Sequence, residues 1–301
     1  PRTRRRIRLP ISLDFTPRLV ASDIDGTILP ATGAVSRRTR DVFARSVDSG
    51  LDVVLVTGRP PRWLPAILRQ TGLTGPVIAA NGAMVVSGPT LEPIEVHPIP
   101  REAAYSAVEL LRAAVPDAVF AAETPAGLRA TSGYLEARGR EQQAPAQRGV
   151  TVVTSTEELL AAGPVVKLVT LADALDPDKF LRIGREQVGH LLTVTRSSVG
   201  RALLELGPPG VTKASTLADL ARSRGIPLTE VVAFGDMPND VEMLRSVGRG
   251  FAMSGGHPEA LAAADATAPP VHEDGVAQVV ERILTARPPH PAPAPGVRTR
   301  R

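Results

Sequence analysis

The pentapeptide Asp23-Ile24-Asp25-Gly26-Thr27 follows the apolar run Leu19-Val20-Ala21 directly, and it limits most strongly what this chain can fold into. The apolar run is typical of a buried strand, and the glycine after the second acid predicts a turn. Side chains two residues apart on a strand point the same way, so the two aspartates can converge on one point. Converging carboxylates suit a metal-assisted reaction centre better than a core. The sequence thus predicts a strand that ends in a reaction site.

The composition of the chain excludes several classes of protein. Its 301 residues can form one large domain or two medium ones, and 43% hydrophobic with 22% charged residues is typical of a soluble protein. The chain has no cysteine, which excludes disulfides and thiolate metal sites, and we expect a cytoplasmic protein. No apolar stretch approaches the roughly 18 residues of a membrane-spanning helix, so we expect no membrane contact.

The basic charge is concentrated at the two termini. Residues 1–17 carry five arginines and one aspartate, and residues 287–301 carry four arginines and no acid. Without these segments, 26 basic and 30 acidic residues remain, so the body of the chain is acidic. We expect residues 1–17 to be a disordered basic tail and residues 287–301 a disordered Pro/Arg tail. The acidic body argues against nucleic acid as the partner.

Apolar runs alternate with helical patterns in residues 18–85 and again in residues 197–286. Strands separated by helices of this length predict a parallel sheet with right-handed crossovers. We therefore expect an α/β core that is discontinuous in sequence. The expected strands are Leu19–Asp23, Asp52–Val56, Val77–Ala80, Val231–Phe234 and Gly250–Met253, and the expected helices are Ser36–Ser49, Arg62–Gln70, Thr212–Arg224, Val241–Val247 and Gly275–Leu284.

Residues 86–196 have a different pattern, which predicts a mixed α/β domain inserted between the two halves of the core. No element is assigned to residues 125–149, which are polar and rich in Gly, Pro and Gln. The strands expected around and within this segment are Met84–Ser87, Ile94–His97, Ala118–Glu123, Val165–Leu171, Leu191–Thr195 and Ala202–Leu206, and the helices are Arg101–Ala114 and one near Asp178–Val188.

Chemically reactive side chains follow several of the expected core strands. Open α/β sheets bind their ligands at the carboxyl edge of the strands, so side chains placed there can act together. The side chains at or just beyond that edge are Asp23 and Asp25, Thr57, Lys213, and Asp236 and Asp240.

Four motifs occur in order, and together they resemble those of the haloacid dehalogenase (HAD) superfamily. Within it, the chain is similar to the Cof-like sugar-phosphatase branch, which carries a large α/β (C2-type) cap between the second and third motifs. The resemblance covers residues 18 to about 284 and implies a Rossmann-like three-layer core with a parallel sheet and an inserted α/β cap. The motifs are Asp23-Ile24-Asp25-Gly26-Thr27, Val56-Thr57-Gly58-Arg59, Lys213 and Gly235-Asp236-Met237-Pro238-Asn239-Asp240, and Ala80-Asn81-Gly82-Ala83 and Asp274-Gly275-Val276-Ala277 also match the branch.

The resemblance implies roles for the first two motifs. Asp23 is the expected nucleophile, which forms an aspartyl-phosphate, and Asp25 is the expected general acid and base. Gly26 permits the turn that brings backbone N–H groups towards the phosphate. Thr57 is expected to offer its hydroxyl and its backbone amide to a phosphoryl oxygen, and Gly58 belongs to the same phosphate-binding turn.

The resemblance also implies roles for the last two motifs. Lys213 is expected to neutralise charge on the transferred group. Asn239 is expected to bind the phosphate or the nearby backbone, and Asp240 to orient Lys213 or water at the metal. Four ionised aspartates would repel a phosphate unless a divalent cation were present, so Mg²⁺ is the expected cofactor. The expected metal site consists of Asp23, Asp25, Asp236 and Asp240.

The expected function is Mg²⁺-dependent hydrolysis of a small phosphorylated metabolite, with a sugar phosphate as one possibility. One alternative is a phosphomutase or phosphotransferase of the same superfamily. A more distant alternative is a non-catalytic scaffold that binds nucleic acid through the basic tails. The chain departs from the branch in one turn, where Ser254-Gly255-Gly256-His257 replaces the usual Gly-Asn-Ala. We expect that turn to lie near the metal edge.

Overall fold

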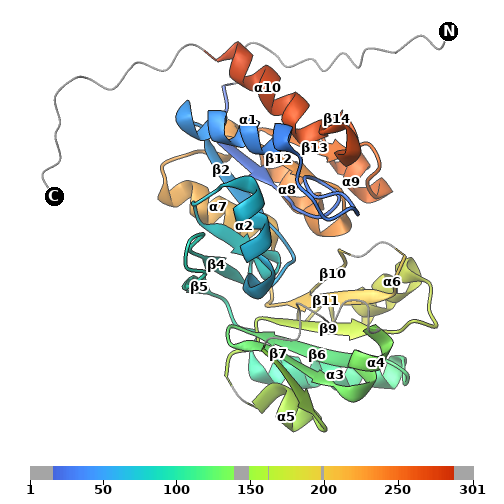
Figure 1. The fold of residues 1–301 in the computed structure, drawn as a ribbon. Coiled ribbons are helices and arrows are strands. Elements are labelled where there is room, and N and C mark those ends of the chain that lie inside the picture. The colour runs from blue at the N-terminus through green and yellow to red at the C-terminus, as the bar shows by residue number, and fades with distance from the viewer. Residues whose placement is uncertain (1–15, 139–148, 162, 198–199, 288–301) are drawn as a thin grey trace, which may run out of the picture.

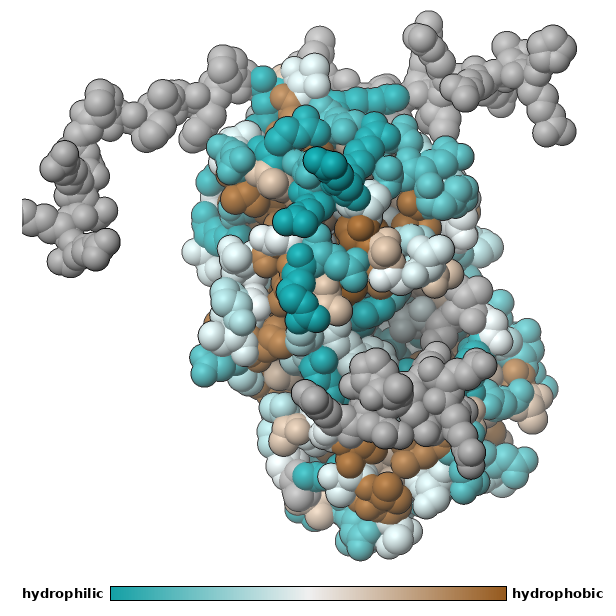
Figure 2. Space-filling view, in the orientation of Figure 1, coloured by the Kyte–Doolittle hydropathy of each residue, from teal (hydrophilic) through white to brown (hydrophobic). Residues whose placement is uncertain are grey.

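The computed structural model describes residues 16–138, 149–161, 163–197 and 200–287, and it contains two sheets, one in each of two lobes (Figure 1). The predicted tails, residues 1–17 and 287–301, lie outside the described residues except for positions 16, 17 and 287. Hydrophilic residues cover most of the face drawn in Figure 2, and hydrophobic residues form small groups between them. This distribution fits two lobes that each bury a core.

The larger lobe contains a sheet of eight strands among the described residues. Its order is β14-β13-β12-β1-β2-β3-β4-β5, and the pairs from β14 to β3 are parallel. The predicted parallel sheet is therefore confirmed. The strands are β1 (Leu19–Ser22), β2 (Asp52–Val56), β3 (Val77–Ala79), β4 (Met84–Val86), β5 (Pro93–Val96), β12 (Val231–Gly235), β13 (Arg249–Met253) and β14 (Ala266–Ala268).

Helices cover both faces of this sheet and complete a three-layer core (Figure 1). Val20 of β1 packs with the helices on one face, whereas its neighbours Leu19 and Ala21 pack with those on the other, as strand alternation requires. The first face carries α1 (Arg37–Asp48), α2 (Pro65–Thr71) and α10 (Gly275–Ala286), and the second carries α7 (Lys213–Ser223), α8 (Val241–Ser246) and α9 (Pro258–Ala263).

Local sequence explains where two of these helices begin. Ser36 caps α1 as predicted, because its hydroxyl accepts the backbone N–H of Thr39. Thr212 and Ser215 cap α7 reciprocally, which fixes the first turn that carries Lys213. The helix predicted at Arg62–Gln70 is instead a short 3-10 helix at Pro61–Trp63 followed by α2.

The smaller lobe contains a sheet of six strands among the described residues, in the order β10-β11-β9-β6-β7-β8. Three of its helices pack on one face of the sheet, and a fourth packs against the opposite face. The strands are β6 (Val119–Thr124), β7 (Gly127–Thr131), β8 (Val150–Val153), β9 (Lys167–Leu171), β10 (Thr193–Thr195) and β11 (Leu203–Gly207); the helices are α3 (Arg101–Ala114), α5 (Thr156–Ala161) and α6 (Pro177–Val188) on the first face and α4 (Ser132–Arg138) on the second.

Two strands belong to a different lobe from the one that the predicted boundaries give. β5, placed in the cap, pairs antiparallel with β4 and extends the larger sheet, whereas β11, beyond the predicted end of the cap at residue 196, pairs with β9 of the smaller sheet. A strand pattern in the sequence does not reveal which sheet the strand will join. The predicted limits of the cap, residues 86 and 196, therefore differ from the limits of the smaller lobe. Within residues 125–149, left without an element, the described part forms β7 and α4. No helix in the described part of the chain is long and apolar enough to cross a membrane.

Candidate active site

The motifs meet at the carboxyl edge of three neighbouring strands. Asp23 follows β1 by one residue, Asp236 follows β12 and Thr57 follows β2, and β1 lies between the other two strands in the sheet. Parallel strands end at the same edge, so residues far apart in sequence are brought together here. Lys213 reaches this edge from the first turn of α7.

Lys213 is the central cation of the site. Its ammonium group is buried and donates hydrogen bonds to Oδ1 of Asp23 at 2.8 Å and to Oδ1 of Asp240 at 2.7 Å. Burial opposes the charge of this lysine, but the two carboxylates outweigh that effect and raise its pKa. Lys213 is therefore a fixed positive charge beside the expected nucleophile.

Asp240 organises its neighbours through both of its carboxylate oxygens. Oδ1 accepts from Lys213, and Oδ2 accepts the backbone N–H groups of Asp236 and Met237, each at 3.0 Å. The carboxylate is completely buried. The prediction that Asp240 orients Lys213 agrees with this geometry. Since both oxygens are occupied, Asp240 is better suited to hold the loop than to bind a metal directly.

Gly26 and Thr27 fit closely around Asp236. A Cβ atom on Gly26 would lie 2.2 Å from Oδ2 of Asp236, and Gly26 has a φ of 74°. The hydroxyl of Thr27 donates to Oδ1 of Asp236 at 3.2 Å. The turn at Gly26 was predicted from the sequence, whereas the space that this glycine leaves for the acid of a different motif is visible only in the structure.

Three of the four predicted metal ligands gather at one point. One carboxylate oxygen each from Asp23, Asp236 and Asp240 lie within 4.8 Å of one another. Asp25 is not in this cluster, because Arg59 holds both of its oxygens at 2.7 and 2.5 Å. The side chain of Asp25 thus lies outside this cluster, and Asp25 as a metal ligand stays a prediction. Arg59 belongs to the second motif but was assigned no role from the sequence.

The charges at this point favour a cation. Burial raises the pKa of Asp23 well above its ordinary value, and the ammonium of Lys213 opposes that rise. Burial, followed by the nearby Asp240, raises the pKa of Asp236 to about 7. Three carboxylates lie close together with one lysine, so negative charge is in excess. All the possible metal ligands are oxygen atoms, which Mg²⁺ prefers. The residues present therefore fit a hard divalent cation.

The backbone amide of Thr57, in the second motif, is already bonded within the sheet. The backbone N–H of Thr57 donates to the carbonyl of Ile78 at 2.8 Å, so it continues the sheet and is not available to a phosphate. The hydroxyl oxygen of Thr57 accepts the N–H of Arg59 at 3.1 Å and keeps its own proton to donate. Of the two donors predicted at Thr57, only the hydroxyl is suited to bind phosphate.

Asn239 lies beside a turn from another part of the chain. Its side-chain Nδ2 donates to Oδ1 of Asn81 at 3.0 Å, and Nδ2 of Asn81 donates to Oε2 of Glu205 at 3.1 Å. Oδ1 of Asn239 is buried and has no partner among the described residues. Asn81 was recognised in the sequence only as part of a motif, and Glu205 was assigned no role there.

The smaller lobe places charged side chains over the site. Lys167 donates to the carbonyl of Gly58 at 2.7 Å and to Oε1 of Glu205 at 2.5 Å, and Glu123 pairs with Arg62 of the larger lobe. Lys167, Glu123 and Glu205 are buried. Each of these charged residues lies on a mainly apolar strand. Because charged side chains are seldom buried without a partner, this pattern is a sequence signal for a buried ion pair, and it was not used in the prediction.

The turn that departs from the branch pattern lies beside the metal cluster, as expected. The N–H of His257 donates to the carbonyl of Asp236 at 2.7 Å, and a Cβ atom on Gly256 would lie 2.8 Å from the same oxygen. The turn therefore supports the backbone of Asp236 without the usual asparagine.

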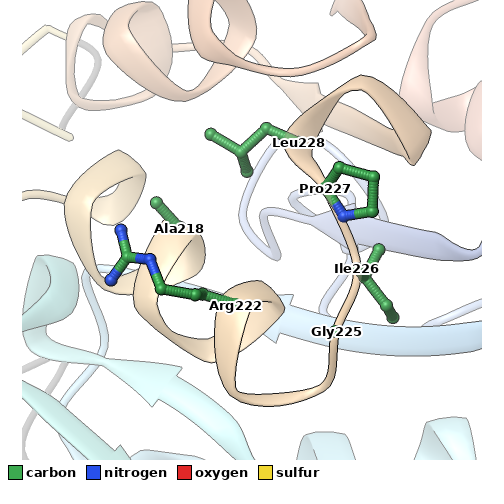
Figure 3. A pocket seen from close by; sticks show the side chains of 6 residues that line it. All are labelled: Ala218, Arg222, Gly225, Ile226, Pro227 and Leu228. Carbon is green, nitrogen blue, oxygen red and sulfur yellow. The ribbon is translucent and has the colours of Figure 1, made fainter.

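A surface pocket of about 280 Å³ lies away from this chemistry (Figure 3). Arg222 and Ala218 line it from the later part of α7, whereas Lys213 begins the same helix. The pocket is therefore near the opposite end of α7 from the site, and it offers none of the groups described above.

Comparison with known proteins agrees with the geometry. A model of haloacid dehalogenase-like hydrolases matches residues 20–280. The chain is 26% identical over 285 residues to Phosphatase YwpJ of Bacillus subtilis (strain 168), covering 89% of this chain and 100% of that protein. It is 27% identical over 267 residues to a phosphoglycolate phosphatase of Methanoculleus marisnigri, covering 88% and 96%.

A solved structure gives the same result for the fold. A haloacid dehalogenase-like hydrolase from B. subtilis matches with a TM-score of 0.75 at 26% identity, covering 88% of this chain and 99% of that one. Since the family match includes the strands, the cap and all four motifs, the chain belongs to the haloacid dehalogenase-like hydrolases.

Proposed function

We propose that this protein is a Mg²⁺-dependent phosphatase that hydrolyses a small phosphorylated metabolite through an aspartyl-phosphate on Asp23. The observation that carries the proposal is the buried ion pair between Asp23 and Lys213 beside Asp236. This arrangement places a nucleophilic carboxylate, a fixed cation and an oxygen-lined cation site together. The names of the matched relatives, both phosphatases, support the same reaction class.

Asp23 has one carboxylate oxygen suited to attack. Lys213 holds Oδ1, and no described residue donates a hydrogen bond to Oδ2. In the first step this oxygen forms a bond to phosphorus while the bond from phosphorus to the ester oxygen breaks. In the second step a water oxygen attacks phosphorus, the bond to Asp23 breaks, and inorganic phosphate leaves. Lys213 stabilises the negative charge on the transferred group throughout.

Asp25 transfers the protons. It gives a proton to the departing ester oxygen in the first step, and it accepts one from the attacking water in the second. Its side chain is 52% exposed, in contrast to the buried Asp23. Arg59 must release Asp25 before that acid carries a proton, and the phosphate of the substrate is an alternative partner for the guanidinium.

The acids of the metal cluster have different roles. Asp23 and Asp236 would hold Mg²⁺, which supplies charge neutralisation for the phosphoryl group when bound. Asp240 holds the loop and Lys213. The smaller lobe excludes water from the reacting groups, because its buried side chains contact Gly58 and Arg62 directly.

The experiment is to measure phosphate release from a panel of phosphorylated metabolites, sugar phosphates first, with Mg²⁺ and with EDTA. Asp23→Asn is expected to lower kcat by about 10⁴-fold or more while the protein stays folded. Asp219→Asn is a matched control, because the ion pair that Asp219 forms within the described part of the chain, with Arg222, is exposed. Turnover by Asp23→Asn close to that of the control would contradict the mechanism. Transfer of the phosphoryl group to a second sugar instead of water would identify a phosphomutase.

A further inference from the structure

Glu205 is a buried acid of the smaller lobe that contacts the catalytic loops. It lies on β11, on the face of the sheet that turns away from α3, α5 and α6, since its neighbours Leu204 and Leu206 pack with those helices. One of its oxygens accepts from Lys167 and the other from Asn81. The chemistry proposed above assigns no role to it.

Glu205 determines which way the Asn81 amide faces. Burial opposes the charge on Glu205, but the charge of Lys167 and the hydrogen bonds from Lys167, Ser197 and Asn81 together outweigh that effect and lower the pKa of Glu205. An ionised carboxylate only accepts hydrogen bonds. The NH₂ end of Asn81 must therefore point to Glu205, and its carbonyl end must point to Asn239.

The same reasoning extends to Asn239. The carbonyl oxygen of Asn81 accepts, so Asn239 must present its NH₂ group to it. This leaves Oδ1 of Asn239 as the buried atom without a partner among the described residues. The orientation of an amide in the loop of Asp236 is thus fixed by a carboxylate 34 positions away, in the other lobe.

The turn that carries Asn81 is well suited to transmit this constraint. Ala80 and Asn81 have positive φ values of 50° and 58°, which is a costly conformation for alanine. The N–H of Asn81 donates to the carbonyl of Thr57. A Cβ atom on Gly82 would lie 2.3 Å from the carbonyl oxygen of Thr212, the cap of the helix that carries Lys213. The turn therefore contacts three of the catalytic motifs.

We propose that Glu205 is a positioning residue: from the smaller lobe it fixes the side chains of Asn81 and Asn239, so that the loop of Asp236 reaches its reactive geometry only when that lobe is in place. This inference rests on the proposed function. According to this inference, the smaller lobe is needed to place the catalytic groups as well as to exclude water from them.

The test is a double-mutant cycle between Glu205 and Asn81. Glu205→Ala is expected to lower kcat about 10- to 100-fold, as a misplacement on the order of 1 Å does, with KM changed less than about threefold. Asn81→Gly removes the side chain at a φ that glycine accepts readily. In the Asn81→Gly background, Glu205→Ala should have a smaller effect, because the link through Asn81 is already missing and only the loss of the pair with Lys167 remains.

Glu123→Ala is the matched control, since Glu123 is also a buried acid of the smaller lobe that pairs with a cation, but its hydrogen-bond partner is Arg62 and not Asn81. Its effect should be the same in both backgrounds. Thermal unfolding confirms that each variant folds. If Glu205→Ala does not fold, Glu205→Asp replaces it, because Asp keeps the charge but has a shorter side chain. Equal effects of Glu205→Ala in both backgrounds would overturn the inference.

Binding of inorganic phosphate in the presence of Mg²⁺ provides a second measurement that needs no substrate. The dissociation constant for phosphate should change in Glu205→Ala, and it should change less when Glu205→Ala is added to Asn81→Gly. A wild-type protein that releases no phosphate from any ester would count against the proposed function. A phosphate affinity that responds to Glu205 regardless of Asn81 would count against the positioning role alone.

Discussion

Gly26 and Asp236 are in such close contact that no side chain fits between them: a Cβ atom on Gly26 would lie 2.2 Å from Oδ2 of Asp236. The two residues are 210 positions apart, and they meet because β1 and β12 are neighbours in the sheet. Gly26 therefore serves two purposes, a turn with positive φ and a space for an acid of the metal cluster.

Gly26→Ala is expected to displace Asp236 and to strain the turn. We expect loss of most phosphatase activity, weaker Mg²⁺ binding and a decrease of about 1–3 kcal/mol in the free energy of unfolding. Gly33→Ala is the control, because Gly33 has a φ of 78° but, its chain neighbours aside, no atom of the described residues lies within 4 Å of its Cβ position. If both variants lose the same activity, the contact with Asp236 has no functional importance.

The pairing of Asp25 with Arg59 separates the acid and base from the metal cluster. Asp25→Asn should reduce turnover strongly yet change the Mg²⁺ dissociation constant by less than about threefold, whereas Asp236→Asn should weaken Mg²⁺ binding by at least about 10-fold. Calorimetric titration of each variant with Mg²⁺ measures the difference. Equal losses of affinity would place the side chain of Asp25 back among the metal ligands.

The raised pKa of Asp236 predicts how the stability of the metal-free protein depends on pH. Its pKa rises from 3.8 to about 7 on folding, chiefly through burial, so the folded state keeps a proton that the unfolded state has lost. This contribution to the free energy of unfolding is complete below pH 3.8 and is lost as the pH rises to about 7, at up to about 1.4 kcal/mol per pH unit.

Urea unfolding in EDTA between pH 4 and 8, compared with Asp236→Asn, measures this effect. Because Asn cannot titrate, the free energy of unfolding of the variant should decrease less with rising pH. The variant should therefore gain stability relative to the wild type near pH 8. The raised pKa of Asp23 adds a contribution of the same sign in both proteins. A difference between wild type and variant that does not change with pH would refute the assignment.

Asp240→Asn should be the most destabilising conservative change at the site. It leaves the buried Lys213 with one carboxylate in place of two, and an amide cannot accept from the lysine and two backbone N–H groups with both of its ends. We expect a loss of roughly 3–5 kcal/mol in the free energy of unfolding, against less than about 0.5 kcal/mol for the exposed Asp219→Asn. Denaturant unfolding of both variants tests this, and similar losses would show that Asp240 has no special structural role.

The core of the fold was readable from the sequence because its signals are local. Apolar runs give the parallel strands, Ser36 and Thr212 mark the helix starts, and the acids that follow the strands locate the reactive edge. The limits of the smaller lobe were not readable in this way. Whether β5 and β11 join one sheet or the other depends on hydrogen bonds with strands far away in the sequence.

The sequence by itself determined the family and the parallel core, and it predicted Asp23, Lys213 and Asp236 as the reactive set. Only the tertiary structure decided how these residues divide their roles. It pairs Asp25 with Arg59, uses the amide of Thr57 in the sheet, and brings Glu205 and Lys167 over the site from the smaller lobe. The physical reason is that a motif specifies which groups are present, whereas the partner of each buried donor or acceptor depends on which distant segment packs against it.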